Sequence, residues 1–112
     1  MNGYESLKNY MNFQNVYKNG CSYANKYLVM YVLENRTDIN RVGISVSKKV
    51  GNSIVRHRLT RLIRESVRLN VENIKQGYDI VIIARAGLKD KKFQETERAF
   101  LHLAKLHGIR VF

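Results

Sequence analysis

The sequence contains no proline and no tryptophan, and Cys21 is its only cysteine. A single cysteine excludes an internal disulfide and a zinc site built from several cysteines, and it is typical of a reducing compartment. No apolar run approaches the roughly 18 residues that a membrane-spanning helix needs, and no export signal is recognisable at the N-terminus. We therefore expect a cytoplasmic protein in which glycine, in the absence of proline, interrupts the helices and strands.

Acidic residues are also scarce. Nine Asp and Glu residues stand against twenty Lys and Arg residues, which gives a formal net charge of +11. Self-repulsion at this charge destabilises a compact chain unless a polyanion relieves it. Nucleic acid is the first candidate partner, and an anionic membrane surface is the second. The length of 112 residues and the hydrophobic content of 45% predict one RNA-binding domain, residues 1–112, around one core.

The most informative segment is GNSIVRHRLTRLIRESVR at 51–68, which predicts an amphipathic helix from about Ser53. One face carries Val55, Leu59, Leu62, Ile63 and Ser66, and the opposite face carries a ridge of His57, Arg61, Arg64 and Arg68, with Arg56 and Arg58 near its start. Glu65 is the only acid between Arg41 and Asn70. A merely solvated face would intersperse more acids, because like charges at this spacing repel. We therefore expect the ridge to contact phosphates, which the planar guanidinium suits.

The remaining patterns predict an α+β fold, with one sheet and helices packed on it. Ser6 is expected to cap a helix that runs to about Lys18, and a last helix is expected over about 91–107. Strands are predicted at 26–33, 41–47 and 78–84, with a possible short strand near 21–24. Alternation in 41–47 places small residues on one face, which a ligand can approach closely. The nearly continuous apolar run at 78–84 is typical of a strand buried on both faces, as in parallel pairing.

Aromatic residues offer a second possible contact with nucleic acid. Phe13 and Tyr17 lie one helical turn apart, and Tyr27 and Tyr31 are expected on one face of a strand. Aromatic rings beside basic residues suit single-stranded RNA, because base stacking contributes about 1–3 kcal/mol for each base. The alternative is that these rings simply belong to the core, and the residues alone favour neither interpretation.

No constellation for catalysis by the protein itself is recognisable. His57, His102 and His107 have no metal-ligand spacing, Cys21 has no histidine near it in sequence, and neither paired carboxylates nor a phosphate-binding glycine loop occurs. Three classes of function are therefore weighed. An accessory RNA-binding subunit, which the family resemblance described next implies, leads; a structural RNA-binding protein of the ribosomal type is the alternative, and a protein nuclease acting alone is third.

Four segments resemble the bacterial ribonuclease P protein family, in order and spacing. They are NFQNVYKNG (12–20), RVGISVSKK (41–49), SVSKKVGNSIVRHRLTRLIRE (45–65) and YDIVIIARAGL (78–88). The resemblance implies a two-layer α-β sandwich whose mixed sheet contains a left-handed β-α-β crossover, against the usual right-handed rule. It also implies an accessory subunit without catalytic residues. In that family a catalytic RNA removes the 5′ leader of precursor tRNA with Mg²⁺, which is bound mainly by the RNA.

The resemblance also implies the residues of two RNA contacts. The expected contacts with ribonuclease P RNA, including ridge residues, are Lys48, Lys49, Asn52, Arg56, His57, Arg58, Arg61, Arg64 and Arg68. The expected contacts with the leader of precursor tRNA are Phe13, Tyr17, Tyr31, Ser47 and Arg85. No metal site in the protein, no membrane and no obligate protein partner are expected. His57 and Thr60 depart from the family pattern, which usually has asparagine and lysine there.

Overall fold

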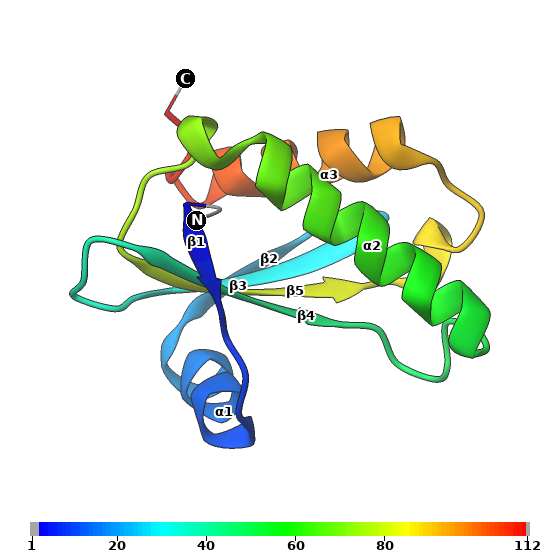
Figure 1. Ribbon diagram of the computed structural model, residues 1–112, viewed down its shortest axis with the longest axis horizontal. Coiled ribbons are helices and arrows are strands. Elements are labelled where there is room, and N and C mark those ends of the chain that lie inside the picture. Colours follow the sequence, from blue (N-terminus) through cyan, green and yellow to red (C-terminus); the bar gives the residue numbers. More distant parts are fainter. Residues whose placement is uncertain (1–2, 112) are drawn as a thin grey trace.

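The computed structural model describes residues 3–111 as a five-stranded mixed sheet with helices on both faces (Figure 1). In chain order the elements are β1 (Tyr4–Ser6), α1 (Tyr10–Asn19), β2 (Cys21–Ala24), β3 (Leu28–Glu34), β4 (Asn40–Ser45), α2 (Ser53–Leu69), η1 (Val71–Asn73), β5 (Tyr78–Ala84), η2 (Ala86–Leu88) and α3 (Phe93–Leu106), where η marks a 3₁₀ turn. The strands lie in the order β1-β4-β5-β3-β2. The predicted α+β fold is confirmed, including the short strand near 21–24.

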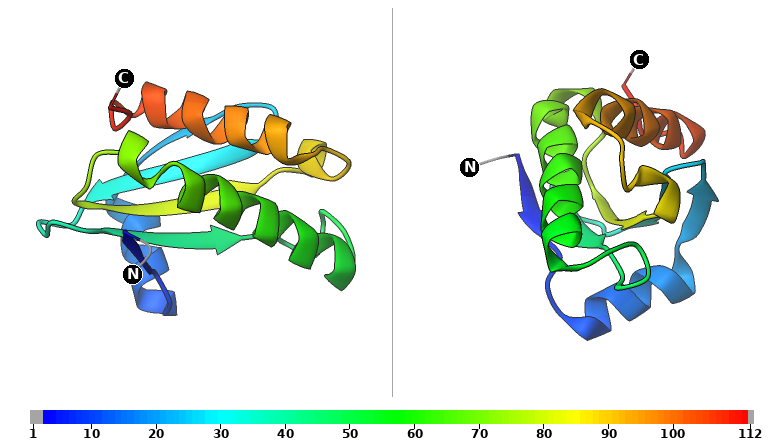
Figure 2. Two further views of the ribbon diagram at one scale, coloured as in Figure 1. Left: turned by 45° about the horizontal axis from the view of Figure 1, so that its top comes forward. Right: turned by 90° about the vertical axis from the view of Figure 1, so that its right-hand side faces the viewer.

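The connection from β4 through α2 to β5 is left-handed, as the resemblance implied. The two strands are neighbours and parallel, with Val42 opposite Ile80 and Ile44 opposite Ile82. In the left view of Figure 2, both strands run to the right, α2 passes in front of the sheet, and β5 lies above β4. A chain that follows this path turns in the left-handed sense. On its other side β5 pairs antiparallel with β3.

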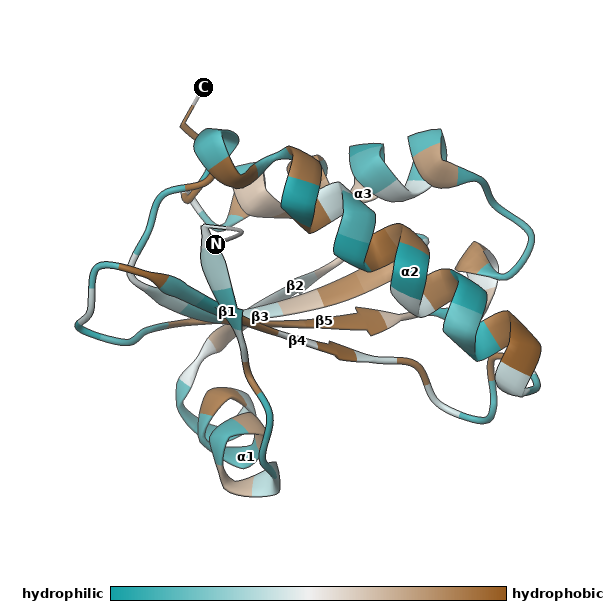
Figure 3. Ribbon diagram, viewed as in Figure 1, coloured by the Kyte–Doolittle hydropathy of each residue, from teal (hydrophilic) through white to brown (hydrophobic). Residues whose placement is uncertain are grey.

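The main core lies between the sheet and the pair α2 and α3. The expected face of α2 is buried at Leu59, Ile63 and Ser66, and Phe100 and Leu103 of α3 lie beside it. Apolar residues dominate β3, β4 and β5, whereas α2 alternates between apolar and polar residues along its length (Figure 3). This sheet with α2 and α3 forms the predicted two-layer sandwich.

A smaller cluster covers part of the opposite face of the sheet. Leu7, Val16 of α1 and Val81 of β5 are buried there. Since Val81 faces α1 while Ile80 and Ile82 face the main core, β5 is buried on both sides, as its apolar run predicted. None of the helices within residues 3–111 has the length and apolar character needed to cross a membrane.

The N-terminal segment differs from the prediction. Ser6 does not cap a helix, because it lies in β1, which pairs with the parallel strand β4. Asn9 is the N-cap of α1 instead, and its Oδ1 accepts a 2.8 Å hydrogen bond from the backbone N–H of Asn12. Asparagine suits this position as well as serine. A strand of three residues is too short to show an alternation that sequence inspection could detect.

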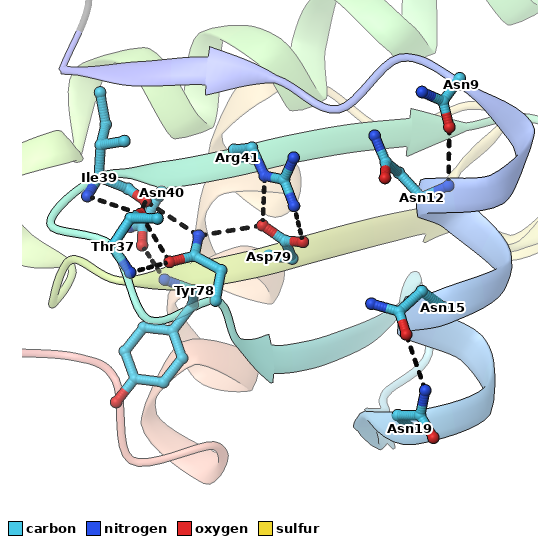
Figure 4. A network of polar contacts seen from close by, with 11 residues as sticks. Asn9, Asn12, Asn15, Asn19, Thr37, Ile39, Asn40, Arg41, Tyr78 and Asp79 are labelled. Atoms are coloured by element: carbon cyan, nitrogen blue, oxygen red, sulfur yellow. Dashed lines mark hydrogen bonds and ion pairs between the residues drawn. The ribbon is translucent and has the colours of Figure 1, made fainter.

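A network of polar contacts holds together the end of the sheet that lies opposite the start of α2 (Figure 4). Nε and Nη2 of Arg41 donate to the buried carboxylate of Asp79 at 2.8 and 2.5 Å. Asn35 donates to the same carboxylate at 3.0 Å. The hydrogen bond from Arg41 stabilises its protonated form and raises its pKa further. Arg41 is therefore an internal partner and does not belong to the cations that face outward.

Candidate RNA interface

The ridge on α2 lies on the surface, as predicted. Asn52 is the N-cap of α2, and its Oδ1 accepts a hydrogen bond from Val55 N–H at 3.0 Å. The helix then buries Leu59 and Ile63 and exposes His57, Arg61, Arg64 and Arg68. The role expected for Asn52 as an RNA contact thus coincides with a structural role.

The basic residues of α2 differ in whether they already bind another group of the protein. Within residues 3–111, His57, Arg61 and Arg64 form no ion pair and no side-chain hydrogen bond. Arg68, in contrast, forms an exposed ion pair with Glu65, whose pKa is lowered by that hydrogen bond. Exposed pairs of this kind contribute little to stability, and a stronger anion can displace them. His57, Arg61 and Arg64 are thus the members of the ridge most directly available to a phosphate.

Two further arginines of the motif are engaged with backbone carbonyl groups. Nη1 of Arg56 donates to the carbonyl oxygen of Gly51 at 3.0 Å. Nη1 and Nη2 of Arg58 donate to the carbonyl oxygens of Lys89 and Lys91 at 3.1 and 2.5 Å. Arg56 therefore braces the start of α2, while Arg58 joins α2 to the segment after β5.

Two adjoining grooves run beside the ridge. The ridge groove, of about 570 Å³, is lined by Ile44, Val46, Arg56, His57, Thr60, Arg61 and Arg64. The aromatic groove, of about 270 Å³, is lined by Tyr4, Ser6, Leu7, Lys8, Phe13, Val42, Gly43, Ile44 and Arg64. Ile44 and Arg64 line both grooves, so Arg64 connects the basic helix with Phe13. Sequence reasoning missed Lys8, because no periodic pattern marks a residue in the loop before α1.

The three aromatic residues expected in the leader contact form one cluster on the α1 side of the sheet. The ring of Tyr17 lies 6.3 Å from that of Phe13 and 5.0 Å from that of Tyr31, both in edge-to-face geometry. All three are half-buried, and burial, aided by the nearby Tyr31, raises the pKa of Tyr17. A Cβ atom on Gly43 would lie 2.4 Å from Cζ of Phe13, so glycine lets the ring approach the sheet.

Tyr27 is a correction to the prediction, because it does not share a face with Tyr31. It precedes β3 and packs against the main core, where Nζ of Lys91 lies 5.7 Å from its ring centroid. The period of two holds only from Leu28, where the strand begins. The turn before β3 therefore directs Tyr27 to the side of the sheet opposite Tyr31.

The remaining predicted residues lie where β4 and β5 end. Ser47, Lys48 and Lys49 are exposed in the loop to α2. The backbone carbonyl oxygen of Ser47 accepts a hydrogen bond from the backbone N–H of Val50 at 3.1 Å. Arg85 follows β5, and its Nη1 donates to the carbonyl oxygen of Asn25 at 2.7 Å. Ser45 is opposite Ile83 in the sheet, so the segments containing Ser47 and Arg85 leave it side by side.

Fold and site together define a class: a small basic α+β protein with an arginine-rich groove that joins an aromatic one, suited to a polyanionic partner. Across residues 3–111 no group of three or more His, Cys, Asp and Glu side chains could hold a metal ion. The family model for ribonuclease P matches residues 1–107, and the chain belongs to the ribonuclease P protein family.

Relatives and solved structures agree with this assignment. The ribonuclease P protein component of Lachnoclostridium phytofermentans is 67% identical over 105 residues, which cover 94% of this chain and 90% of the relative. That of Clostridioides difficile is 52% identical over 108 residues, covering 96% and 95%. The structure of the RNase P protein of Staphylococcus aureus has a TM-score of 0.86 at 36% identity, covering 93% and 95%. That of Thermotoga maritima has a TM-score of 0.84 at 34% identity, covering 91% and 96%.

Proposed function

We propose that this chain is the protein subunit of a ribonuclease P holoenzyme. It binds the catalytic RNA and the 5′ leader of precursor tRNA, and it assists the RNA-catalysed, Mg²⁺-dependent 5′ maturation of tRNA in the cytoplasm. The whole chain, residues 1–112, acts as one RNA-binding domain. The observation that carries the proposal, beside family membership, is the exposed set His57, Arg61 and Arg64, which borders two adjoining grooves.

The contact with the catalytic RNA is assigned to the ridge and the loop before it. Arg61 and Arg64 contribute charge-assisted hydrogen bonds to phosphates, and His57 adds a polar contact in the same groove. Lys48 and Lys49 extend the cationic surface, while Asn52, Arg56 and Arg58 hold it in shape through their bonds to the backbone. Arg68 joins the contact by exchanging Glu65 for a phosphate.

The leader contact is assigned to the other face of the sheet. Phe13, Tyr17 and Tyr31 offer half-exposed rings, and Gly43 of β4, which lacks a Cβ atom, lets the Phe13 ring lie directly on the sheet. Ser47 and Arg85 lie at the end of the same face and contribute polar contacts. Stacking on exposed ring surface tolerates any base, which suits a leader whose sequence varies from one tRNA to another.

Mg²⁺ is assigned to the RNA partner. The groove beside the ridge is lined by arginines, His57, Thr60 and two apolar residues and has no carboxylate, whereas Mg²⁺ requires oxygen ligands, usually carboxylates, phosphates and water. The chain's own contribution to the reaction is to neutralise phosphate repulsion and to hold the substrate. The protein is thus an accessory subunit, and the RNA performs the cleavage.

One experiment tests the proposal. Precursor tRNA is incubated with Mg²⁺ and with the purified chain, with ribonuclease P RNA, or with both. At a limiting concentration of Mg²⁺ and RNA, we expect cleavage to be strongly increased by the chain and to be absent with the chain alone. Cleavage by the chain alone would indicate a protein nuclease. RNA binding without any gain in cleavage would indicate a structural RNA-binding protein.

A further inference from the structure

A pocket of about 310 Å³ lies at the junction of the β2–β3 hairpin and α3, away from both grooves of the proposed interface. We call it the hairpin pocket. Lys26 and Tyr27 of the turn line one side, and Glu95, Arg98 and His102 of α3 line the other, with Asn25 between them. None of these residues belongs to the two RNA contacts proposed above.

Basic residues outnumber acidic ones in the lining of the pocket. Within residues 3–111, neither Lys26 nor Arg98 forms an ion pair or a side-chain hydrogen bond. Lys91 lies at the edge of the pocket, with its Nζ 5.7 Å from the Tyr27 ring centroid. The one acid in the lining, Glu95, keeps its negative charge while its Oε1 accepts the backbone N–H of Lys92 at 3.0 Å and caps α3. Two cations against one carboxylate leave a net positive charge among the residues that line the pocket.

Hydrogen bonds hold the pocket in one shape. Oδ1 of Asn25 accepts the backbone N–H groups of Tyr27 and Leu28 at 3.1 and 3.0 Å. This fixes the amide so that its Nδ2 donates to the carbonyl oxygen of Ala99 at 3.0 Å and faces Nδ1 of His102 at 3.1 Å. Asn25 thereby ties the hairpin to α3 before any ligand arrives.

The same bonds determine the tautomer of His102. Because Nδ2 of Asn25 is a donor, Nδ1 of His102 must accept, and the neutral ring carries its proton on Nε2. His102 therefore supplies an N–H donor in addition to the ammonium group of Lys26 and the guanidinium of Arg98. Ammonium, guanidinium and imidazole N–H groups around a rigid pocket match the acceptor oxygens of a phosphate group.

The pocket is also connected to the proposed interface. Arg58 of α2 binds the carbonyl oxygens of Lys89 and Lys91, and Arg85 binds that of Asn25. The left view of Figure 2 shows that the start of α2, the segment containing η2, the start of α3 and the hairpin lie toward the same end of the molecule. The segment 85–92, with basic residues Arg85, Lys89, Lys91 and Lys92 and the acid Asp90, thus lies between the ridge and the hairpin pocket.

We propose that the hairpin pocket binds a phosphate group of RNA and gives the protein an RNA contact separate from the ridge and from the leader face. This inference rests on the proposed function. The phosphate comes either from the catalytic RNA or from the body of precursor tRNA, and the chemistry of recognition is the same for both.

The test compares the double variant K26Q/R98Q with the control R36Q/K75Q. Both pairs are exposed and both changes remove two positive charges, but Arg36 and Lys75 lie at the opposite end of the sheet. The affinity of each variant is measured for ribonuclease P RNA alone, and the affinity of each assembled holoenzyme for precursor tRNA, across a salt series. Thermal unfolding of each variant verifies the fold, and the single variants K26Q and R98Q resolve the separate contributions.

For K26Q/R98Q we expect a loss of about tenfold in affinity for one of the two RNAs. The slope of log affinity against log salt concentration should also become smaller, by the amount expected for the loss of about one to two phosphate contacts. Which affinity falls identifies the source of the phosphate. The control should change by less than about twofold, as expected for a distant charge screened by salt. If K26Q/R98Q matches the control in both assays, the pocket does not bind RNA and the inference is wrong. The variant R61A/R64A is measured in parallel, and its failure to weaken binding would count against the proposed function instead.

Discussion

Arg58 and Lys91 are joined by a 2.5 Å hydrogen bond, from Nη2 of the guanidinium to the backbone carbonyl oxygen, although 33 residues separate them. A second bond reaches the carbonyl oxygen of Lys89 at 3.1 Å. Within one motif, Arg58 thus holds the backbone of a neighbouring basic segment in place, whereas Arg61 and Arg64 face solvent and form the exposed surface.

Replacing Arg58 tests this division. Arg58→Ala should accelerate hydrogen exchange of the backbone amides of Lys89 and Lys91, whose bonds to Ala86 and Leu88 close that turn. Loss of charge-assisted bonds to a partly buried carbonyl should reduce the free energy of unfolding by about 1–3 kcal/mol. Arg58→Lys should recover only part of the lost free energy of unfolding, because an ammonium group cannot bind both carbonyl oxygens as the guanidinium does. Unchanged exchange together with weakened RNA binding would instead make Arg58 a direct contact.

The ridge is tested by single substitutions on α2. Arg61→Ala and Arg64→Ala should each weaken binding of the catalytic RNA by about 1–3 kcal/mol. Since both side chains are exposed, the free energy of unfolding should change by no more than about 0.5 kcal/mol. Arg68→Ala is the matched control on the same helix and should cost less, because Glu65 already engages that guanidinium. Binding titrations and denaturant unfolding measure both quantities, and equal affinity in all three variants contradicts the assignment.

Gly43 and Phe13 provide a test of the leader face. Gly43→Ala places a Cβ atom against the Phe13 ring and must displace it, at a cost of about 1–3 kcal/mol in the free energy of unfolding. Both Gly43→Ala and Phe13→Ala should reduce the preference of the holoenzyme for precursor over mature tRNA while leaving its assembly intact. The measurement is the ratio of the two tRNA affinities. An equal loss for precursor and mature tRNA would be evidence against a leader contact here.

The stability of the protein should fall in mild acid because of His107. Its half-buried ring packs edge-on against Tyr23, and its Nε2 donates to the carbonyl oxygen of Met30 at 2.8 Å. Burial lowers the pKa of His107 below the ordinary value of 6.5, although the bond to Met30 acts in the opposite direction. The unfolded chain then takes up the proton more readily, so this contribution to stability is complete above pH 6.5 and is lost as pH falls toward the lower, folded-state pKa.

Denaturant unfolding between pH 7 and 5 measures this effect. His107→Gln is the appropriate control, because its amide can also donate to the carbonyl oxygen of Met30 but does not titrate. The variant should lose less stability than the parent protein over this interval. A parallel decline in both proteins would assign the pH dependence to other groups.

Elements with a strong periodic pattern could be predicted from the sequence. Features that depend on a single residue, or on a contact with a distant part of the chain, could not. The apolar run at 78–84 coincides with β5, and α2 begins at Ser53 as its two faces required. The sequence predicts Ser6 as the cap of α1 and the structure has Asn9, because serine and asparagine are equivalent caps and only the pairing of β1 with β4 decides between them. The bonds of Arg58 were unpredictable, because the carbonyl groups that it binds lie more than thirty residues later and carry no side-chain signal.

The parallel pairing of β4 with β5 has a consequence for how tightly RNA can be held. Both strands end on the same side, so the basic segments 46–52 and 85–92 emerge next to each other from a rigid sheet. An antiparallel pair would have placed them at opposite ends of the molecule. A partner that engages one segment therefore meets the other at high effective concentration, and the gain is avidity obtained without any additional surface.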